Sequence, residues 1–445
     1  MMSKKVCMFV WNHFTNDARV LRECTALSES GYEVDLICIH DPKDKSLPRF
    51  EQRNDLFKVY RIKRYPVLLE MIQKVYRFSM QNKLFGAFFL LIWGLLIFLA
   101  PILFLTLTIL AVLLLKTKLN VVWVRGSLIL GMIMKGYAKK YDIYHSNDLN
   151  TLPQGYFCSK WRLKPKKLIY DSHEVQTSRT GYSSPVYGKM EGFLIKRIDE
   201  MMVENDTRAK YNEDLYGFYP HVVHNYPFKQ TSTNEEKVDL HAILDIPKDE
   251  KILLYQGGVQ TGRGLDKLIQ AVPLFNEGIL VLIGDGKIKK ELQTMVEEKG
   301  LQDKVKFLPK VPLADLPKYT RNAYLGFQVL NNVCFNHYSA SSNKLFEYMM
   351  AGVPVVACDF PEIKRVVEGD GTGVSVDSHD PESIANGVNI LLENEIMHRE
   401  MKQRSLEASK KYNWENESHD FLRVYKNLFF ENINAGKSEG FELKG

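Results

Sequence analysis

The sequence predicts an α/β protein with two doubly wound domains, each built around a parallel sheet, and one long apolar insertion. Short apolar segments alternate with amphipathic stretches in two separate series along the chain. A polar segment at residues 227–251 divides the two series and indicates a linker that leads into a second domain. Thirty-two consecutive uncharged residues, 84–115, interrupt the first series.

The first series begins with "VCMFVW", an apolar segment that is too short for a signal-peptide core and suits a buried strand. Residues 17–30 have apolar side chains at helical spacing, and "EVDLICI" and "KVYRIK" are the next expected strands. After the insertion, the strands resume with "DIYHS", "KLIYDS", "EMMVEN" and "HVVHN". We therefore assign residues 1–228 to an N-terminal Rossmann-like domain.

The second series consists of "ILLYQ", "ILVLIG", "VKFLP", "YLGFQVL", "PVVACD" and "GVSVD", with helical patterns in the gaps. We assign residues 229–410 to a second Rossmann-like domain. Open α/β sheets bind ligands outside the carboxyl ends of their strands. Two such domains facing each other would therefore form a deep central cleft.

The composition is that of a globular chain, and a net charge of +6 over 445 residues gives no indication of nucleic-acid binding. Six scattered cysteines form no CxxC pair and no Cys/His cluster, which favours reduced thiols in a cytosolic compartment. The sequence contains no HExxH motif, no GxSxG motif with partners and no acidic DxD-type site. We therefore predict no metal site and no cofactor.

The apolar insertion is too long for one membrane crossing. A helix of 32 residues would extend about 48 Å, whereas the hydrocarbon core of a bilayer is about 30 Å thick. Pro101 lies near the middle of the run, and proline breaks or kinks a helix. The run therefore predicts a hairpin with two arms of about 15 residues, each about 22 Å long.

Both flanks of this hairpin are basic. Residues 49–83 contain nine Lys or Arg against three Asp or Glu, and residues 116–140 contain six and no acid. Basic flanks stay cytoplasmic, so we predict that the hairpin anchors the protein at the cytoplasmic face of the cell membrane. Re-entry into one leaflet and two short spans both remain open, and a buried pair of core helices is the alternative to membrane insertion.

The stretch "SASSNKLFEYMMAGVPVVACD", residues 339–359, predicts a short helix over 343–351 that is followed directly by a strand. Asn343, Lys344 and Glu347 lie near the start of this helix and share a face. Helix N-termini attract phosphate through free N–H groups and the helix dipole. A lysine there adds charge, and a carboxylate can accept hydrogen bonds from sugar hydroxyls. The alternative is a capped helix with solvated charges.

A glycine-rich strand-to-helix turn, "YQGGVQTGRGL", occupies residues 255–265. Gly257 and Gly258 let the backbone approach a ligand closely, and Arg263 at the helix start suits a diphosphate. The turn fits neither Walker A nor GxGxxG, so a simple turn is the alternative. "LIGDGK", which contains Gly284, is a similar but weaker turn after the next strand.

Polar residues also follow two strands of the first series. His145, Asn147 and Asp148 belong to the first of these segments, and His173 and Glu174 belong to the second. A lone histidine is more often structural than functional, so these residues by themselves leave both interpretations open.

Six motifs, in the right order, resemble those of retaining family-4 glycosyltransferases with the GT-B fold, of the type that builds bacterial surface polysaccharides. "SNKLFEYMMAGVPVVACD" resembles the donor-site helix of that family, and "YQGGVQTGRGLDKLIQAV" resembles its phosphate-binding turn. The other similar segments are "LIGDGKIKKEL", "DLNTLPQG" followed by "LIYDSHE", "HVVHNYP" and "YNWE". The resemblance covers most of the chain outside the insertion, and it implies that residues 411–435 form a helix that crosses back to the N-terminal domain.

This resemblance implies a site for a nucleotide diphosphate sugar. Asn343, Lys344 and Arg263 would hold the diphosphate, and Glu347 would bind the donor ribose. The full donor-binding set that it implies is Gly257, Gly258, Arg263, Gly284, Lys310, Val311, Asn343, Lys344 and Glu347.

Within that set, Gly284 and the backbone around Lys310 and Val311 would line the nucleoside pocket. His173 would lie beside the donor sugar and the acceptor, and it would form the catalytic set together with Arg263 and Lys344.

Three positions depart from the pattern of the family. Ser339 stands where many members have a second glutamate, Gly258 stands where many have arginine, and Asn147 stands where relatives often have histidine. The resemblance implies a metal-independent hexosyltransferase that moves a sugar, with retention, to a lipid-linked or surface-glycan acceptor at the membrane. The alternatives are a nucleotide-sugar epimerase of the same fold and a non-catalytic component of a polysaccharide assembly complex.

Overall fold

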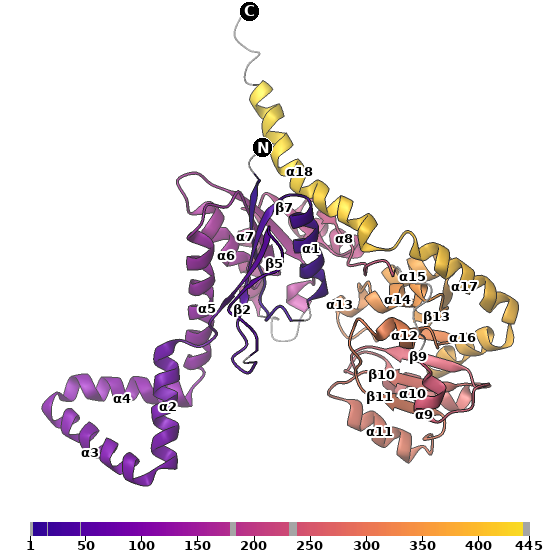
Figure 1. Ribbon diagram of the computed structural model, residues 1–445, viewed down its shortest axis with the longest axis horizontal. Coiled ribbons are helices and arrows are strands. Elements are labelled where there is room, and N and C mark those ends of the chain that lie inside the picture. The colour runs from indigo at the N-terminus through magenta and orange to yellow at the C-terminus, as the bar shows by residue number, and fades with distance from the viewer. Residues whose placement is uncertain (1–2, 16, 45, 179–183, 231–237, 439–445) are drawn as a thin grey trace, which may run out of the picture. The chain divides into compact units, whose positions relative to one another are not determined.

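The computed structural model describes residues 3–15, 17–44, 46–178, 184–230 and 238–438 of the chain (Figure 1). The chain divides into two compact units. Unit 1 comprises Met1–Asp171 and Phe193–Asp199, and unit 2 comprises Ser172–Gly192 and Glu200–Gly445. Part of the predicted linker, residues 231–237, lies outside the described residues. The domain boundaries at 228/229 and 410/411 stay predictions.

The first sheet has the strand order β3-β4-β2-β1-β5-β6-β7-β8. Strand β3 is antiparallel to β4, whereas the pairs from β4 to β6 and the pair β7–β8 are parallel. The strands are β1 Lys5–Phe9, β2 Glu33–Ile39, β3 Phe50–Gln52, β4 Phe57–Ile62, β5 Ile143–Asn147, β6 Lys167–Ser172, β7 Glu200–Val203 and β8 His221–Val222. The helices of this part outside the insertion are α1 Ala18–Glu29, α6 Leu152–Lys160, α7 Pro185–Ile195 and α8 Asp206–Tyr216.

The second sheet lies within unit 2, and all its strands are parallel, in the order β11-β10-β9-β12-β13-β14. The strands are β9 Ile252–Gln256, β10 Ile279–Ile283, β11 Val305–Leu308, β12 Leu325–Gln328, β13 Val355–Cys358 and β14 Gly373–Val376. The helices are α9 Leu240–Leu244, α10 Leu265–Ala271, α11 Lys289–Glu298, α12 Leu316–Thr320, α13 Phe335–Tyr338, α14 Asn343–Met350, α15 Pro361–Gly369, α16 Pro381–Glu393, α17 Glu395–Ser409 and α18 Trp414–Ser438.

This second sheet is buried on both faces. Leu253 and Tyr255 of β9 belong to one core cluster, whereas Ile252 and Leu254 belong to the other. Successive side chains of a strand point to opposite faces, so one continuous apolar strand fills both cores. The sequence alternation therefore predicted this doubly wound sheet correctly.

The insertion in unit 1 comprises four helices, and it is larger than the predicted hairpin. The run 84–115 forms most of α3, Lys83–Leu99, and α4, Pro101–Lys116. It is flanked by α2, Val67–Gln81, and α5, Leu119–Tyr137, and α2, α3 and α4 extend away from the sheet (Figure 1). The sequence interpretation took 116–140 only as a basic flank, because its lysines and Arg125 hid the helical apolar face.

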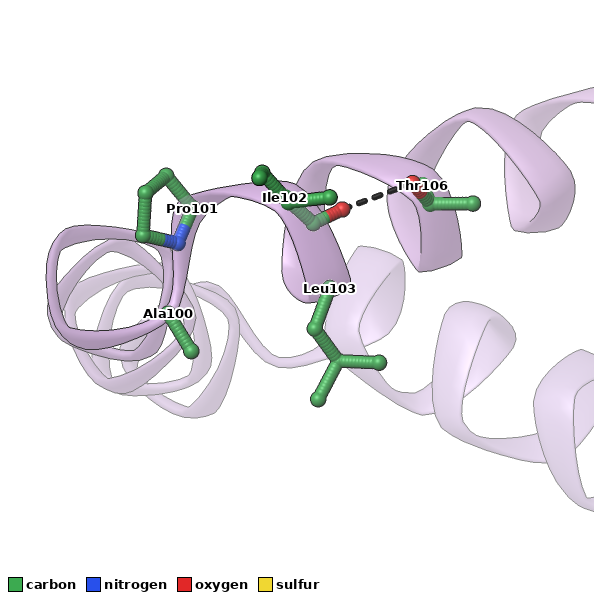
Figure 2. Close-up of a pocket in the computed structure, with 5 residues that line it drawn as sticks. All are labelled: Ala100, Pro101, Ile102, Leu103 and Thr106. Carbon is green, nitrogen blue, oxygen red and sulfur yellow. Dashed lines mark hydrogen bonds between the residues drawn. The ribbon is translucent and has the colours of Figure 1, made fainter.

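The two apolar helices fold back on each other at Pro101. Figure 2 shows this junction, where Pro101 opens α4 and Thr106 Oγ1 donates a hydrogen bond of 2.6 Å to the carbonyl of Ile102. Proline suits the first position of a helix because an N–H there has no partner within the helix. Further along, Trp93 Nε1 donates to Thr108 Oγ1 over 2.8 Å. The predicted break at the proline is therefore present.

The surface of α3 and α4 is apolar and open. None of the residues of α3 is buried, and Leu114 alone is buried in α4. At the junction, the exposed fractions are 83% for Phe98 and 85% for Ile102, and the five residues of Figure 2 line a shallow hollow of about 490 Å³. Apolar patches of this kind mark interaction surfaces. By length and composition one described helix, α5, could cross a membrane, and 17% of its apolar stretch is buried.

Candidate functional site

Three turns of unit 2 lie at one edge of the second sheet. Gly257 follows β9, Gly284 follows β10, and Lys310 comes two residues after β11. The strand order runs outward from β9 through β10 to β11, whereas β12 pairs with the other side of β9. The sheet therefore reverses its winding between β9 and β12. Ligands of open α/β sheets bind at such a reversal, outside the carboxyl ends of the strands.

The first two turns approach each other so closely that only glycine fits at Gly284. A Cβ there would lie 1.9 Å from the carbonyl oxygen of Gly257. Gly257 itself has a φ of +134° and donates its N–H to Ile283 O over 2.9 Å. Gly258 is different, because a Cβ there would meet only Gln260, at 3.8 Å. A Cβ at position 258 would therefore have only ordinary van der Waals contacts.

Asp285 links the turn after β10 to the turn after β11. Its Oδ1 accepts a hydrogen bond of 2.7 Å from Lys289 Nζ, and its Oδ2 accepts one of 2.8 Å from the N–H of Lys310. The bond from Lys289 lowers the pKa of Asp285. The N–H of Lys310 is thus already used within the protein, and the role of Lys310 and Val311 in a nucleoside pocket stays a prediction.

The turn that carries Arg263 packs against the end of β12. The N–H of Asn331 donates to Gly262 O over 3.0 Å, and a Cβ on Gly264 would lie 2.4 Å from Val329 O. Gly262 and Gly264 have φ values of +81° and +68°, a region that glycine adopts readily. Arg263 lies between these glycines, is partly exposed, and makes no ion pair with the residues that the structure describes.

Helix α14 begins at Asn343, as predicted, and ends one residue before the predicted end at 351. Its N-cap residue, Ser342, makes no side-chain capping bond. In the described part of the chain, the Asn343 side-chain oxygen is buried without a hydrogen-bond partner. The start of α14 therefore offers uncapped N–H groups and an unused acceptor, both of which suit a phosphate and its sugar.

Lys344 lies beside the glycine turn of β9. Its Nζ is 4.3 Å from the centroid of the Tyr255 ring, and a Cβ on Gly257 would lie 3.6 Å from the same atom. Removal from water, together with the positive charge of Arg263, lowers the pKa of Lys344 to about 7, and Glu347 opposes both effects. The structure therefore brings two basic side chains together, and a diphosphate beside them would favour the protonated form of Lys344.

Glu347 is held in place by two residues that the sequence interpretation missed. Gln256 Nε2 donates to Glu347 Oε2 over 2.7 Å, and Thr320 Oγ1 donates to Gln256 Oε1 over 2.7 Å. The sequence does indicate Gln256, because it is a polar residue at the carboxyl end of a predicted buried strand. Thr320, at the end of α12, carries no comparable signal in the sequence.

Ser339, which departs from the pattern of the family that the sequence resembles, is fully buried in a polar network of unit 2. Its Oγ accepts a hydrogen bond of 3.1 Å from Arg208 Nε, and its carbonyl accepts one of 2.7 Å from Asn205 Nδ2. Arg208 also donates to the carbonyl oxygen of His173 and pairs with Glu204. Ser339 therefore binds protein groups, and the place of the His173 ring beside a donor stays a prediction.

The polar residues of unit 1 form a buried ionic cluster. Arg19 pairs with Asp171 at 2.8 Å and with Glu23 at 2.9 Å, and all three side chains are buried. His145 Nε2 lies 3.8 Å from Asp171 Oδ2. Asn147 Nδ2 donates to the Phe9 carbonyl over 2.9 Å. Arg19 thus offsets one of the two carboxylate charges, and the bond from Asn147 links β5 to β1.

Residues 236–408 match the family described as glycosyl transferases group 1. Unit 2 carries a group 1 glycosyltransferase domain. The domain spans the whole second sheet and every candidate donor-binding residue from Gly257 to Glu347.

Curated relatives of this glycosyltransferase domain are moderately similar. The D-inositol 3-phosphate glycosyltransferase of Xylanimonas cellulosilytica is 29% identical over 187 residues, which is 41% of this chain and 43% of that protein. The phosphatidyl-myo-inositol mannosyltransferase of Mycobacterium leprae is 27% identical over 189 residues, which is 41% of this chain and 48% of that protein. The chain thus spans about half of the length of these curated relatives.

Solved structures match over nearly the whole chain. Sucrose-phosphate synthase from Thermosynechococcus elongatus aligns with a TM-score of 0.70 at 16% identity, over 96% of this chain and 100% of the other. HepE from Anabaena, solved in complex with UDP, aligns with a TM-score of 0.65 at 15% identity, over 95% and 100% of the two chains. The protein has the GT-B fold, with two Rossmann-like domains.

Proposed function

We propose that this protein is a retaining hexosyltransferase that moves a sugar from a nucleotide diphosphate sugar to a lipid-linked or surface-glycan acceptor. The main support for the proposal is that Arg263 and Lys344 lie near each other, beside the uncapped start of α14. Two cations and a helix N-terminus, placed where a sheet reverses its winding, make a site for two phosphates. The glycosyltransferase names of the relatives and the UDP bound in HepE support the same donor class.

The chemistry that we propose relies on the leaving group. As the bond between the anomeric carbon and the diphosphate breaks, negative charge grows on the phosphate oxygen and positive charge grows on the sugar ring. Arg263 and Lys344 stabilise the departing diphosphate by placing fixed positive charge where negative charge develops. Glu347, held by Gln256, accepts hydrogen bonds from the ribose hydroxyls. No metal ion is required for these steps.

We further propose that the four-helix insertion brings the enzyme to the cytoplasmic face of a membrane. Its support is the exposed apolar surface of α3 and α4 and the basic flanks on both sides. Helices of 17 and 16 residues extend about 25 Å each, slightly less than a bilayer core. A lipid-linked acceptor fits this location, and the mannosyltransferase of Mycobacterium leprae is named for a phosphatidyl-linked inositol.

The test is a panel of nucleotide diphosphate sugars incubated with the full chain and a bacterial lipid extract. Mass spectrometry should detect one donor consumed and one hexose mass added to a lipid, and NMR of the product should show the anomeric configuration of the donor. An inverted anomer would contradict the retaining mechanism. Interconversion of the nucleotide sugar without an acceptor would identify an epimerase instead.

A further inference from the structure

A cavity with both polar and apolar walls lies at the base of the insertion in unit 1. Its volume is about 550 Å³, and its walls come from the ends of β1 and β2 and from α2 and α5. Trp11, Asn12 and His13 follow β1, and Ile39 is the last residue of β2. The cavity therefore lies outside the carboxyl ends of two parallel strands, which is the edge where open α/β sheets bind ligands.

The charge of this cavity is positive. Arg64, just before α2, and Arg125, on α5, both line it, and none of the lining residues is acidic. Neither guanidinium makes an ion pair with any residue that the structure describes, so both charges are available to a ligand. Guanidinium groups bind phosphate through paired hydrogen bonds, and a carbon-rich wall strengthens such bonds by excluding water.

Further hydrogen-bond donors line the same cavity. The side-chain amides of Gln73 and Asn120 and the indole N–H of Trp11 belong to the lining residues. His13 Nδ1 lies 3.0 Å from the carbonyl oxygen of Ile39, so this nitrogen donates its proton there and the ring is fixed in place. Amide and indole N–H groups donate to phosphate oxygens and to sugar hydroxyls.

The two helices that line the cavity, α2 and α5, also expose apolar side chains. On α2 the exposed fractions of Leu68 and Met71 are 58% and 57%, and on α5 that of Val122 is 66%. An anionic ligand with a hydrocarbon chain could place its head in the cavity and its chain along these helices. A free phosphate would make no use of the apolar surface.

We propose that this cavity binds the phosphate head of a membrane lipid, with Arg64 and Arg125 on the phosphate and the lipid chain along α2 and α5. The bound lipid is the acceptor to which the sugar is transferred, and this part of the inference rests on the proposed function. The insertion then has two roles, because it provides both the membrane-binding surface of the protein and part of the acceptor site.

The test measures lipid binding without any sugar donor. A prenyl phosphate with a short chain is titrated against the full-length protein in detergent, with the matching prenyl alcohol and inorganic phosphate as separate ligands. The wild-type protein should bind the prenyl phosphate at least about 10-fold more tightly than either comparison ligand. The variant Arg64→Gln/Arg125→Gln should lose this preference, by about 10-fold for each arginine.

The matched control is Lys74→Gln/Lys118→Gln, which removes two exposed charges near the same helices but outside the cavity. It should keep the preference for the prenyl phosphate, and thermal unfolding should show that both double variants are folded. An equal loss in the control, a retained preference in the arginine variant, or equally tight binding of inorganic phosphate would each overturn the proposal. Absence of sugar transfer by a protein that passes this binding test would count against the proposed function and not against the site.

Discussion

Gln256 and Glu347 are joined by a hydrogen bond of 2.7 Å from Nε2 to Oε2, which links the end of β9 to the first turns of α14. Gln256 is itself fixed by Thr320 Oγ1, so the amide can present only its nitrogen to the carboxylate. The glutamate is thereby oriented before any ligand arrives. Such preorganisation reduces the cost of binding, because the side chain does not have to be ordered in the complex.

The first prediction concerns this carboxylate. Glu347→Gln should weaken binding of the donor nucleotide by about 10- to 100-fold, since it replaces charge-assisted hydrogen bonds worth about 1.5–3 kcal/mol. Isothermal titration calorimetry measures the affinity. The control is Glu298→Gln, on the exposed face of α11, which should bind normally. Unchanged affinity in Glu347→Gln would mean that Glu347 lies on the helix surface and does not bind the donor.

The second prediction follows from the depressed pKa of Lys344. The pKa of Lys344 is about 7 in the folded protein and about 10.5 in the unfolded chain, so the unfolded chain binds more protons between these values. The destabilisation that this causes is complete below pH 7 and disappears as the pH rises to about 10.5. Lys344→Met should therefore raise the melting temperature of the ligand-free protein most at pH 6 to 7, and least near pH 10. A gain that is independent of pH would contradict the shifted pKa.

The third prediction concerns metal ions. Transfer should continue in EDTA, because Arg263 and Lys344 supply the positive charge beside the diphosphate. The measurement compares initial rates before and after chelation, and again after magnesium or manganese is added. Complete loss of transfer in EDTA, restored by either metal, would show that a metal site takes part.

The fourth prediction separates membrane attachment from donor chemistry. Replacing residues 84–115 with a short Gly/Ser linker should release the protein from membranes, because this change removes α4 up to Leu115 and nearly all of α3. The variant should retain slow donor hydrolysis or transfer to a short soluble acceptor, while transfer to the lipid falls. Fractionation and both assays on one preparation check this. A soluble but unfolded variant would mean that these helices are core, and a membrane-bound variant with normal lipid transfer would mean that they are not the anchor.

The sequence predicted those parts of the fold that depend on local patterns. Alternating apolar segments predicted both sheets, and the cap, glycine and proline around α14 predicted a helix over 343–351 where the structure has Asn343–Met350. Pro101 predicted the break between α3 and α4. These features follow from the chemistry of a few neighbouring residues, which is why one sequence is sufficient to find them.

Features that depend on distant contacts were missed. Thr320 reaches Glu347 only through Gln256, from an element 27 residues away in the chain, and no local pattern indicates that link. Helix α5 was interpreted as a flank, because charges such as Arg125 obscured its apolar stripe. The cavity beside it unites segments from residue 11 to residue 128, so it emerges only once the chain is folded.

The most direct test of the central claim is the rate of sugar transfer by Lys344→Ala and by Arg263→Ala, measured against Lys402→Ala, which removes an exposed lysine of α17. The two cations lie at the start of α14 and at the glycine-rich turn before α10, where the diphosphate is expected to leave. Each site variant should lose about 10²-fold or more in transfer rate, as when one oxyanion donor is removed, while remaining folded and while Lys402→Ala keeps the wild-type rate. Wild-type rates in both folded site variants would contradict the assignment of this site to the diphosphate.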